Sequence, residues 1–165
     1  MSALLVIAGV VAAVMVVNSV LPAISGSSNS IAQASAKVSD RIETQVSIVY
    51  ATGELDTTGT WQDTNSDSDF DITVWVKNVG NARILDVGQM DVFLGRSGTF
   101  ARIPYVDDAG ASYPRWVYAL ENGDEWENSV TAKITIHYSS TQASDTYMVK
   151  VITPSGAYDE HYFSF

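Results

Sequence analysis

The segment from Asp63 to Asp71 carries the side chains with the clearest potential for chemistry. Residues with side-chain oxygens recur there at every second position: Asp63, Asn65, Asp67, Asp69 and Asp71. A hard cation such as Ca²⁺ takes about six to eight oxygen ligands, and the spacing resembles the first half of an EF-hand loop. However, Ser68 replaces the turn glycine, and Val74 stands where a bidentate Glu is expected. The sequence leaves two interpretations open, a Ca²⁺ site and a solvated acidic loop, and it favours the loop.

No other group of residues predicts catalysis. Three carboxylates surround Trp126 within residues 124–127, but glycoside hydrolysis needs two carboxylates at a defined separation in a cleft. A polar turn ahead of a strand is the simpler interpretation. The two histidines, His137 and His161, lie in alternating segments without a neighbouring nucleophile motif, and no G-x-S-x-G elbow occurs. We therefore predict that the chain is not an enzyme and takes no cofactor besides the candidate Ca²⁺.

Charge divides the chain into two parts. No charged residue or histidine precedes Lys37, so all 19 acidic and all 9 basic residues lie from Lys37 onward, with a net charge of −10. This sign is opposite to the one that nucleic acid or an anionic lipid surface attracts, so we exclude nucleic-acid binding. The chain has no cysteine, and neither a disulfide framework nor a thiolate metal site is available.

The N-terminal part is built on an apolar helical pattern. Residues 3–17 are apolar without interruption, and the run extends to Ile24 if two polar residues are tolerated. This approaches the roughly 20 residues that cross a membrane. A cleaved signal peptide is the competing interpretation, but no basic residue precedes the run, and we expect the segment to be retained. Beyond it, Ile24, Ile31 and Val38 recur at intervals of seven in a weakly polar, uncharged stretch.

From these patterns we expect residues 1–48 to form one long hydrophobic helix, inserted in the membrane before assembly and packed in a filament core afterwards. The side chains expected to drive that assembly are Leu4, Leu5, Ile7, Val11, Val14, Val17, Leu21, Ile24, Ile31, Val38 and Ile42. Small residues between them, such as Gly9, Ala12 and Ala13, let helix backbones approach closely. A single-pass anchor is the alternative for the same segment.

The C-terminal part, residues 49–165, changes to a period of two and to residue types that favour strands. Turn signals separate eight candidate strands, at residues 45–51, 71–79, 89–95, 102–105, 116–119, 129–138, 146–152 and 158–165. Several short strands at this spacing predict an antiparallel sandwich. The alternation also assigns faces: Ile72, Val74 and Val76 point to one side, and Trp75 points to the other. The predicted fold class is α+β, with the long helix followed by an all-β immunoglobulin-like sandwich.

Three stretches carry a resemblance to a known family. They are ALLVIAGVVAAVMVV near the N-terminus, DRIETQVSIVYATGEL at the helix end, and ITVWVKNVGNARILDVGQMDVFLG in the first sandwich strands. They resemble the archaeal flagellins (archaellins), whose N-terminus is similar to that of type IV pilins and whose outer domain is an immunoglobulin-like sandwich. Bacterial pilins usually have a glutamate at the fifth mature position, where this chain has Leu5. The resemblance also implies that Met1 follows a removed leader.

The resemblance implies a structural subunit of the archaellum filament, which polymerises with copies of itself. Its location would be the extracellular filament after a transient stay in the cell membrane, and its partners the archaellum or pilus assembly machinery. Two alternatives remain, an accessory or stator-type envelope protein anchored by the helix and an adhesive type IV-like pilin. Likeness of fold alone does not separate them.

Overall fold

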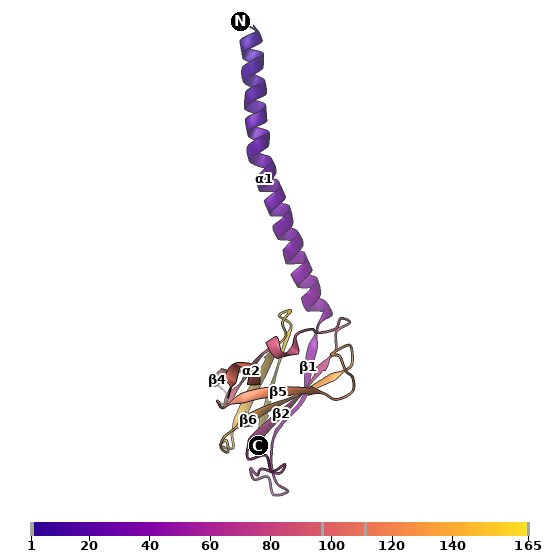
Figure 1. Cartoon of the computed structure of the whole chain (residues 1–165), viewed down its shortest axis with the longest axis vertical. Helices are drawn as coiled ribbons and strands as arrows, with labels where there is room; N and C mark the ends of the chain where they lie inside the picture. Colours follow the sequence, from indigo (N-terminus) through magenta and orange to yellow (C-terminus); the bar gives the residue numbers. More distant parts are fainter. Residues whose placement is uncertain (1, 97, 111, 165) are drawn as a thin grey trace. The chain divides into compact units, whose positions relative to one another are not determined.

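A computed structural model describes residues 2–96, 98–110 and 112–164 of the chain, and in the first helix it describes the side chains of residues 3, 5–15 and 27–43. The contacts divide the chain into two compact units, Met1–Ser39 and Asp40–Phe165. Helix α1 spans Ser2–Glu43 (Figure 1). Its described apolar side chains are exposed, for example Leu5 at 75% and Ile31 at 67%.

Eight strands form two four-stranded antiparallel sheets in the second unit (Figure 1). One sheet has the order β1-β2-β6-β5 and the other has the order β4-β3-β7-β8. The strands are β1 (Val46–Gly53), β2 (Phe70–Asn78), β3 (Asp91–Arg96), β4 (Thr99–Ile103), β5 (Arg115–Leu120), β6 (Thr131–Tyr138), β7 (Thr146–Ile152) and β8 (Tyr158–Ser164). A short 3-10 helix η1 (Val87–Gln89) precedes β3, and a short helix α2 (Val106–Ala109) follows β4.

The alternation along the strands decides which residues fill the space between the sheets. Ile72, Val74 and Val76 on β2 are fully buried, and so are their pairing partners on β6. Trp75 is on the opposite, outer face, as the alternation predicts. Burying such side chains stabilises the sandwich by about 1.5–3 kcal/mol each. The same pattern therefore forms the strands and the core.

The predicted positions of the strands are confirmed for all eight, with shifts at their ends. The prediction at residues 146–152 coincides with β7, whereas the prediction at residues 102–105 lies late, because β4 begins at Thr99. β4 is exposed over four of its five residues. It has no buried face along most of its length, and it therefore gives no alternation from which to find its start.

The predicted α+β class is wrong, because the fold is mainly β. The buried hydrophobic cluster of the described residues draws on the strands and the segments that connect them, and α1 contributes nothing to it. A domain belongs to the α+β class when its helices pack on the sheet around a shared hydrophobic core. The expectation of one long helix through residue 48 is also corrected. The helix ends at Glu43, and its last turn, from Asp40 on, belongs to the sandwich unit. Its described side chains fall mainly into two short stretches, 5–15 and 27–43.

Within the sandwich unit, backbone hydrogen bonds fasten the segment that leads into β1. The amides of Val79 and Gly80 both donate to the carbonyl of Gln45, at 2.9 and 3.0 Å, and the amide of Ala82 donates to the carbonyl of Glu43 at 3.0 Å. The bond to Glu43 satisfies a carbonyl group that a helix end leaves without an intrahelical partner. The loop after β2 thus fixes residues 43–45 to the sandwich.

Candidate functional site

The acidic segment predicted as a cation loop lies in the connection between β1 and β2. The Asp63 carboxylate accepts hydrogen bonds from the amides of Ser66 and Ser68, at 2.6 and 2.9 Å, and it caps the turn. Asn65 donates its amide group to the carboxylates of Asp67 and Asp71. Alternating side-chain oxygens therefore serve the loop's own backbone and each other, an arrangement that is common in turns rich in Asp and Asn.

Residues distant in sequence close this loop on the sheet. Glu54 accepts hydrogen bonds from the amides of Thr64 and Asn65 with one carboxylate oxygen and from the amide of Asp71 with the other. Asp69 accepts a 2.6 Å hydrogen bond from the hydroxyl of Tyr113. The sequence analysis missed Glu54 and Tyr113, because no local pattern links them to positions about 10 and 44 residues away.

His137 on β6 faces the acidic loop, where its Nδ1 lies 2.7 Å from Asp71 Oδ1 and 3.6 Å from Asp69 Oδ2. The hydrogen bond with Asp71 raises the pKa of His137 above its ordinary value of 6.5, against the opposing effect of burial, and the nearby carboxylates add to the rise. When His137 is protonated, the arrangement is an ion pair in which the imidazolium bridges two carboxylates. The sequence analysis, which found no nucleophile motif beside His137, missed this contact.

The pairing of His137 predicts a pH-dependent contribution to stability. Because the folded pKa is raised, the contribution is fully present below pH 6.5 and is lost as the pH rises through the raised value. We expect His137→Gln to lower the free energy of unfolding by about 1 kcal/mol in acid and by less in alkali. Urea unfolding of the two proteins, on the acid side and on the alkaline side of the raised pKa, measures the difference in the free energy of unfolding. A difference that does not change with pH, or one that persists unchanged in an Asp71→Asn background, contradicts the prediction.

Asp67, Asp71 and His137 are the described residues that could jointly hold a metal, since one ligand atom from each lies within 4.8 Å of the others. The surroundings fit Ca²⁺ poorly. Asn65 presents its NH₂ group to the carboxylates rather than its oxygen, and Arg115 Nη2 lies 3.8 Å from Asp69. Ca²⁺ prefers six to eight oxygens. The Ca²⁺ interpretation stays a prediction, which calorimetric titration of the chain with Ca²⁺ would test.

The outer face of the sheet β1-β2-β6-β5 carries a patch suited to a partner. Tyr50 on β1 contacts the ring of Trp75 at a centroid distance of 5.7 Å, and Trp75 Nε1 donates to Glu121 at 3.0 Å. Lys133 Nζ lies 5.9 Å from the centre of the Trp75 ring. Because Val49 and Tyr50 stay more than half exposed, the patch offers apolar and aromatic surface to solvent.

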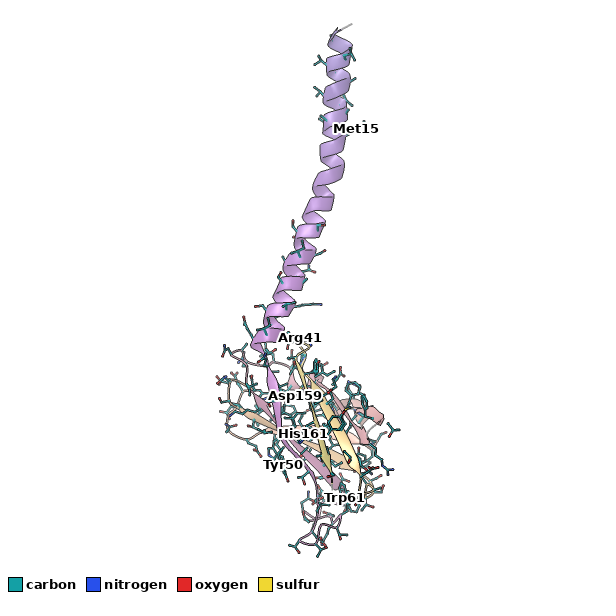
Figure 2. The ribbon with its side chains drawn as sticks, turned by 180° about the vertical axis from the view of Figure 1, so that it is seen from behind. Met15, Arg41, Tyr50, Trp61, Asp159 and His161 are labelled. Atoms are coloured by element: carbon teal, nitrogen blue, oxygen red, sulfur yellow. The ribbon has the colours of Figure 1, made fainter. Side chains whose placement is uncertain are left out.

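The β1 edge of this sheet meets β8 of the other sheet. The chain bulges between Ile48 and Tyr50, and the amide of Ile48 donates to the Asp159 carboxylate at 2.7 Å. Figure 2 shows Asp159 and His161 of β8 close to Tyr50 on this side. Tyr158 and Tyr162 add exposed aromatic surface to β8. Aromatic residues are enriched in protein interfaces, so this side is the strongest candidate for binding another protein.

The residues predicted for the assembly helix divide by how far they are described. The side chains of Leu4, Val17, Leu21 and Ile24 lie outside the described residues. The other seven are exposed: Leu5, Ile7, Val11, Val14, Ile31, Val38 and Ile42. Their role in assembly stays a prediction. Among the side chains that are described, no helix presents an apolar stretch of the length needed to cross a membrane.

Comparison with known proteins places the chain in a family. Its sequence matches the archaeal-type flagellin family over residues 1–163. It is similar to an uncharacterized protein of Archaeoglobus fulgidus, with 26% identity over 170 residues that cover 99% of this chain and 95% of the relative.

Two solved structures share the fold. The archaellum periplasmic stator protein FlaG from Sulfolobus acidocaldarius matches with a TM-score of 0.56 and 24% identity, covering 73% of this chain and 99% of that one. The complex of the stator proteins FlaF and FlaG from the same organism matches with a TM-score of 0.54 and 23% identity, covering 73% and 89%. The resemblance indicated by the sequence is confirmed, and the chain belongs to the archaeal-type flagellin family.

Proposed function

We propose that this protein is an accessory component of the archaellum of the stator kind, whose sandwich binds a partner in the cell envelope. Its family makes it an archaellum-related protein, and that family is a structural component rather than an enzyme family. One observation carries the proposal. The match to the stator protein FlaG takes in 99% of that protein's chain, so the whole of the stator fold is represented here.

The partner we propose is a second stator-type protein, because the matched FlaG is also found in a complex with FlaF. The exposed side chains of Val49 and Tyr50 on β1 and of Tyr162 on β8 offer the surface for it. These side chains are 55–57% exposed in the free chain. A partner that covered them would gain binding free energy, because burying aromatic side chains strengthens binding.

Substituting Tyr50 tests the proposed surface. We expect Tyr50→Glu to weaken co-purification with a FlaF-type protein by about tenfold or more, because truncating or charging a central aromatic side chain removes a main anchor of an interface. Phe100→Glu on β4 is the matched control, since Phe100 is another exposed aromatic side chain, at 46%, and lies in the other sheet. The assignment of this surface is contradicted if both variants lose co-purification equally, or if Tyr50→Glu does not lose it.

The filament subunit is the second candidate, and it is favoured by the extent of the family match, which includes α1 as well as the sandwich. Exposed apolar side chains along α1, such as Leu5 and Ile7, are also available for contacts between copies. The stator proposal rests on the sandwich and the filament alternative on the helix. The two proposals therefore predict different places for the chain, the cell envelope or the filament, and different amounts of it in the filament.

Fractionation of cells separates the two. Filaments are sheared from the cells, and mass spectrometry compares the amount of this chain with that of the main filament subunit in the sheared and the envelope fractions. The stator proposal expects the chain in the envelope fraction and only traces in the filaments. If the chain is the main component of purified filaments, the proposal is wrong and the filament interpretation is correct.

A further inference from the structure

A cleft of about 510 Å³ is lined by residues other than those assigned to the stator-type partner. Three connecting segments and the end of β5 form it: residues 83–89, 105–107 and 124–126, with Tyr118 and Leu120. Its volume is within the range of roughly 300–1,000 Å³ that is usual for binding sites. Asp107 of helix α2 is one of the lining residues, and α2 lies beside β5 (Figure 1).

Buried hydrogen bonds hold the connecting segments in place. The amide of Ile84 donates to the carbonyl of Trp126 at 3.0 Å, which joins two of the segments. The side chain of Asn78, which is fully buried, donates to the carbonyls of Ala82 and Trp126 at 2.9 Å each. Trp126 Nε1 donates to the carbonyl of Val130 at 3.1 Å. The cleft is therefore a fixed shape rather than a gap between loose loops.

Aromatic rings form its inner wall. Tyr105 lies 4.7 Å from the ring centre of Trp116 and 6.2 Å from that of Tyr118. A Cβ atom at Gly88 would lie 3.1 Å from the Tyr105 ring, so this glycine lets the chain pass close beneath it. Tyr105 and Tyr118 are half-buried, and each presents part of its ring to the cleft.

Carboxylates form its rim. Asp86, Asp107, Asp124 and Glu125 line the cleft, and each is exposed. Arg83 forms an ion pair with Glu125. None of the three aspartates has an ion pair with a basic side chain in the part of the chain that the structure describes. The rim thus keeps an excess of negative charge next to tyrosine rings.

We propose that this cleft binds an arginine side chain presented by a protein partner. A guanidinium group is planar, stays charged, stacks on aromatic rings and forms hydrogen bonds with carboxylates. Tyr105 and Tyr118 offer the rings, while the aspartates offer the acceptors. A hydrated lysine ammonium would use the charge but little of the aromatic wall. The proposal does not depend on the stator function, because it uses a different surface.

The arrangement does not fit a metal ion equally well. Metal binding needs several ligand atoms close together, and the described side chains bring three such residues within 4.8 Å only at Asp67, Asp71 and His137. The carboxylates of the cleft instead come from separate segments around the aromatic wall. Such spacing suits a ligand with the extent of a side chain.

The test uses two short peptides and the full chain. The probe is acetyl-Gly-Arg-Gly-amide, and its control replaces arginine with citrulline, which has nearly the same shape without the charge. Backbone amide NMR shifts follow the titration at low salt. We expect millimolar binding of the arginine peptide, with shifts concentrated at residues 84–89 and 124–126, and weaker binding as salt rises. The citrulline peptide should cause little change.

Two charge-matched variants decide whether the cleft is responsible. Asp86→Asn/Asp107→Asn should weaken binding about fivefold, and asparagine keeps the left-handed backbone of Asp86, whose φ is 53°. Asp108→Asn/Glu127→Gln removes the same charge from neighbouring positions outside the cleft and should change affinity less than twofold. Equal weakening by both variants, shifts spread over the surface, or no binding at millimolar peptide overturns the proposal. Loss of the stator-type partner has no bearing on it.

Discussion

Asn78→Ala should lower the free energy of unfolding by about 3 kcal/mol, the largest effect expected for a single polar residue here. Asn78 is fully buried, and its amide nitrogen donates to the carbonyls of Ala82 and Trp126. Its side-chain oxygen accepts the amide of Gly80 at 2.9 Å. Alanine removes all three hydrogen bonds, and two of them, to the carbonyl of Trp126 and from the amide of Gly80, are buried. Urea denaturation measures the loss.

Asn122→Ala is the control for this prediction. The Asn122 side chain likewise bonds to main-chain groups, with one hydrogen bond to the carbonyl of Ser129 and one from the amide of Thr131, but it is exposed. Water can replace these bonds, so the expected loss is about 1 kcal/mol or less. If the two variants lose similar stability, burial is not the reason for the importance of Asn78.

Gly80→Ala should destabilise the chain by about 3 kcal/mol through a backbone clash. The added Cβ would overlap the carbonyl oxygen of Glu43 and lie 2.5 Å from the Gln45 nitrogen. Both are main-chain atoms, so the segment leading into β1 must move and lose its bonds to the loop after β2. We expect a lower thermal midpoint and faster trypsin cleavage after Arg41, whose segment is freed.

Gly123→Ala supplies the comparison. Its Cβ would come within 2.8 Å of a methyl group of Val130, which is a side chain and can shift. The expected change is about 1 kcal/mol, without faster cleavage after Arg41. Rapid cleavage in Gly123→Ala, or normal cleavage in Gly80→Ala, would show that the segment before β1 is not held by the contacts around Gly80.

The strands could be predicted because each carries its own signal. Ile72, Val74 and Val76 alternate with polar or outward residues, and only one of the two faces can be buried. Asn78 also follows this alternation, and it is buried as its position indicates. The start of β4 could not be found, because its residues are exposed on both faces. The alternation of residues therefore predicts a strand where one of its faces is buried.

The class of the fold required information that local pattern does not hold. A helical period predicts a helix, and α1 is one, but whether it covers a sheet depends on contacts between distant parts of the chain. The candidate sites show the same limit. The alternating oxygens of residues 63–71 were visible in the sequence, whereas the pairing of Asp71 with His137 joins residues 66 positions apart. The sequence predicts a polar turn at residues 124–127, and the structure has one. That this turn forms one side of a cleft could not be predicted, because the cleft also needs Tyr105 and Asp86 from other segments.

The hydrogen bonds that fix residues 43–45 to the loop after β2 also bear on mechanics. Tension on the chain ahead of Asp40 would reach the sandwich at this point. The Gln45 carbonyl is held by two amides and the Glu43 carbonyl by a third, so the three bonds share the strain before it reaches the β1–β2 ladder. Rupture would then require several bonds to fail together, and the force at which β1 is pulled away is set by the loop around Gly80 as well as by the sheet.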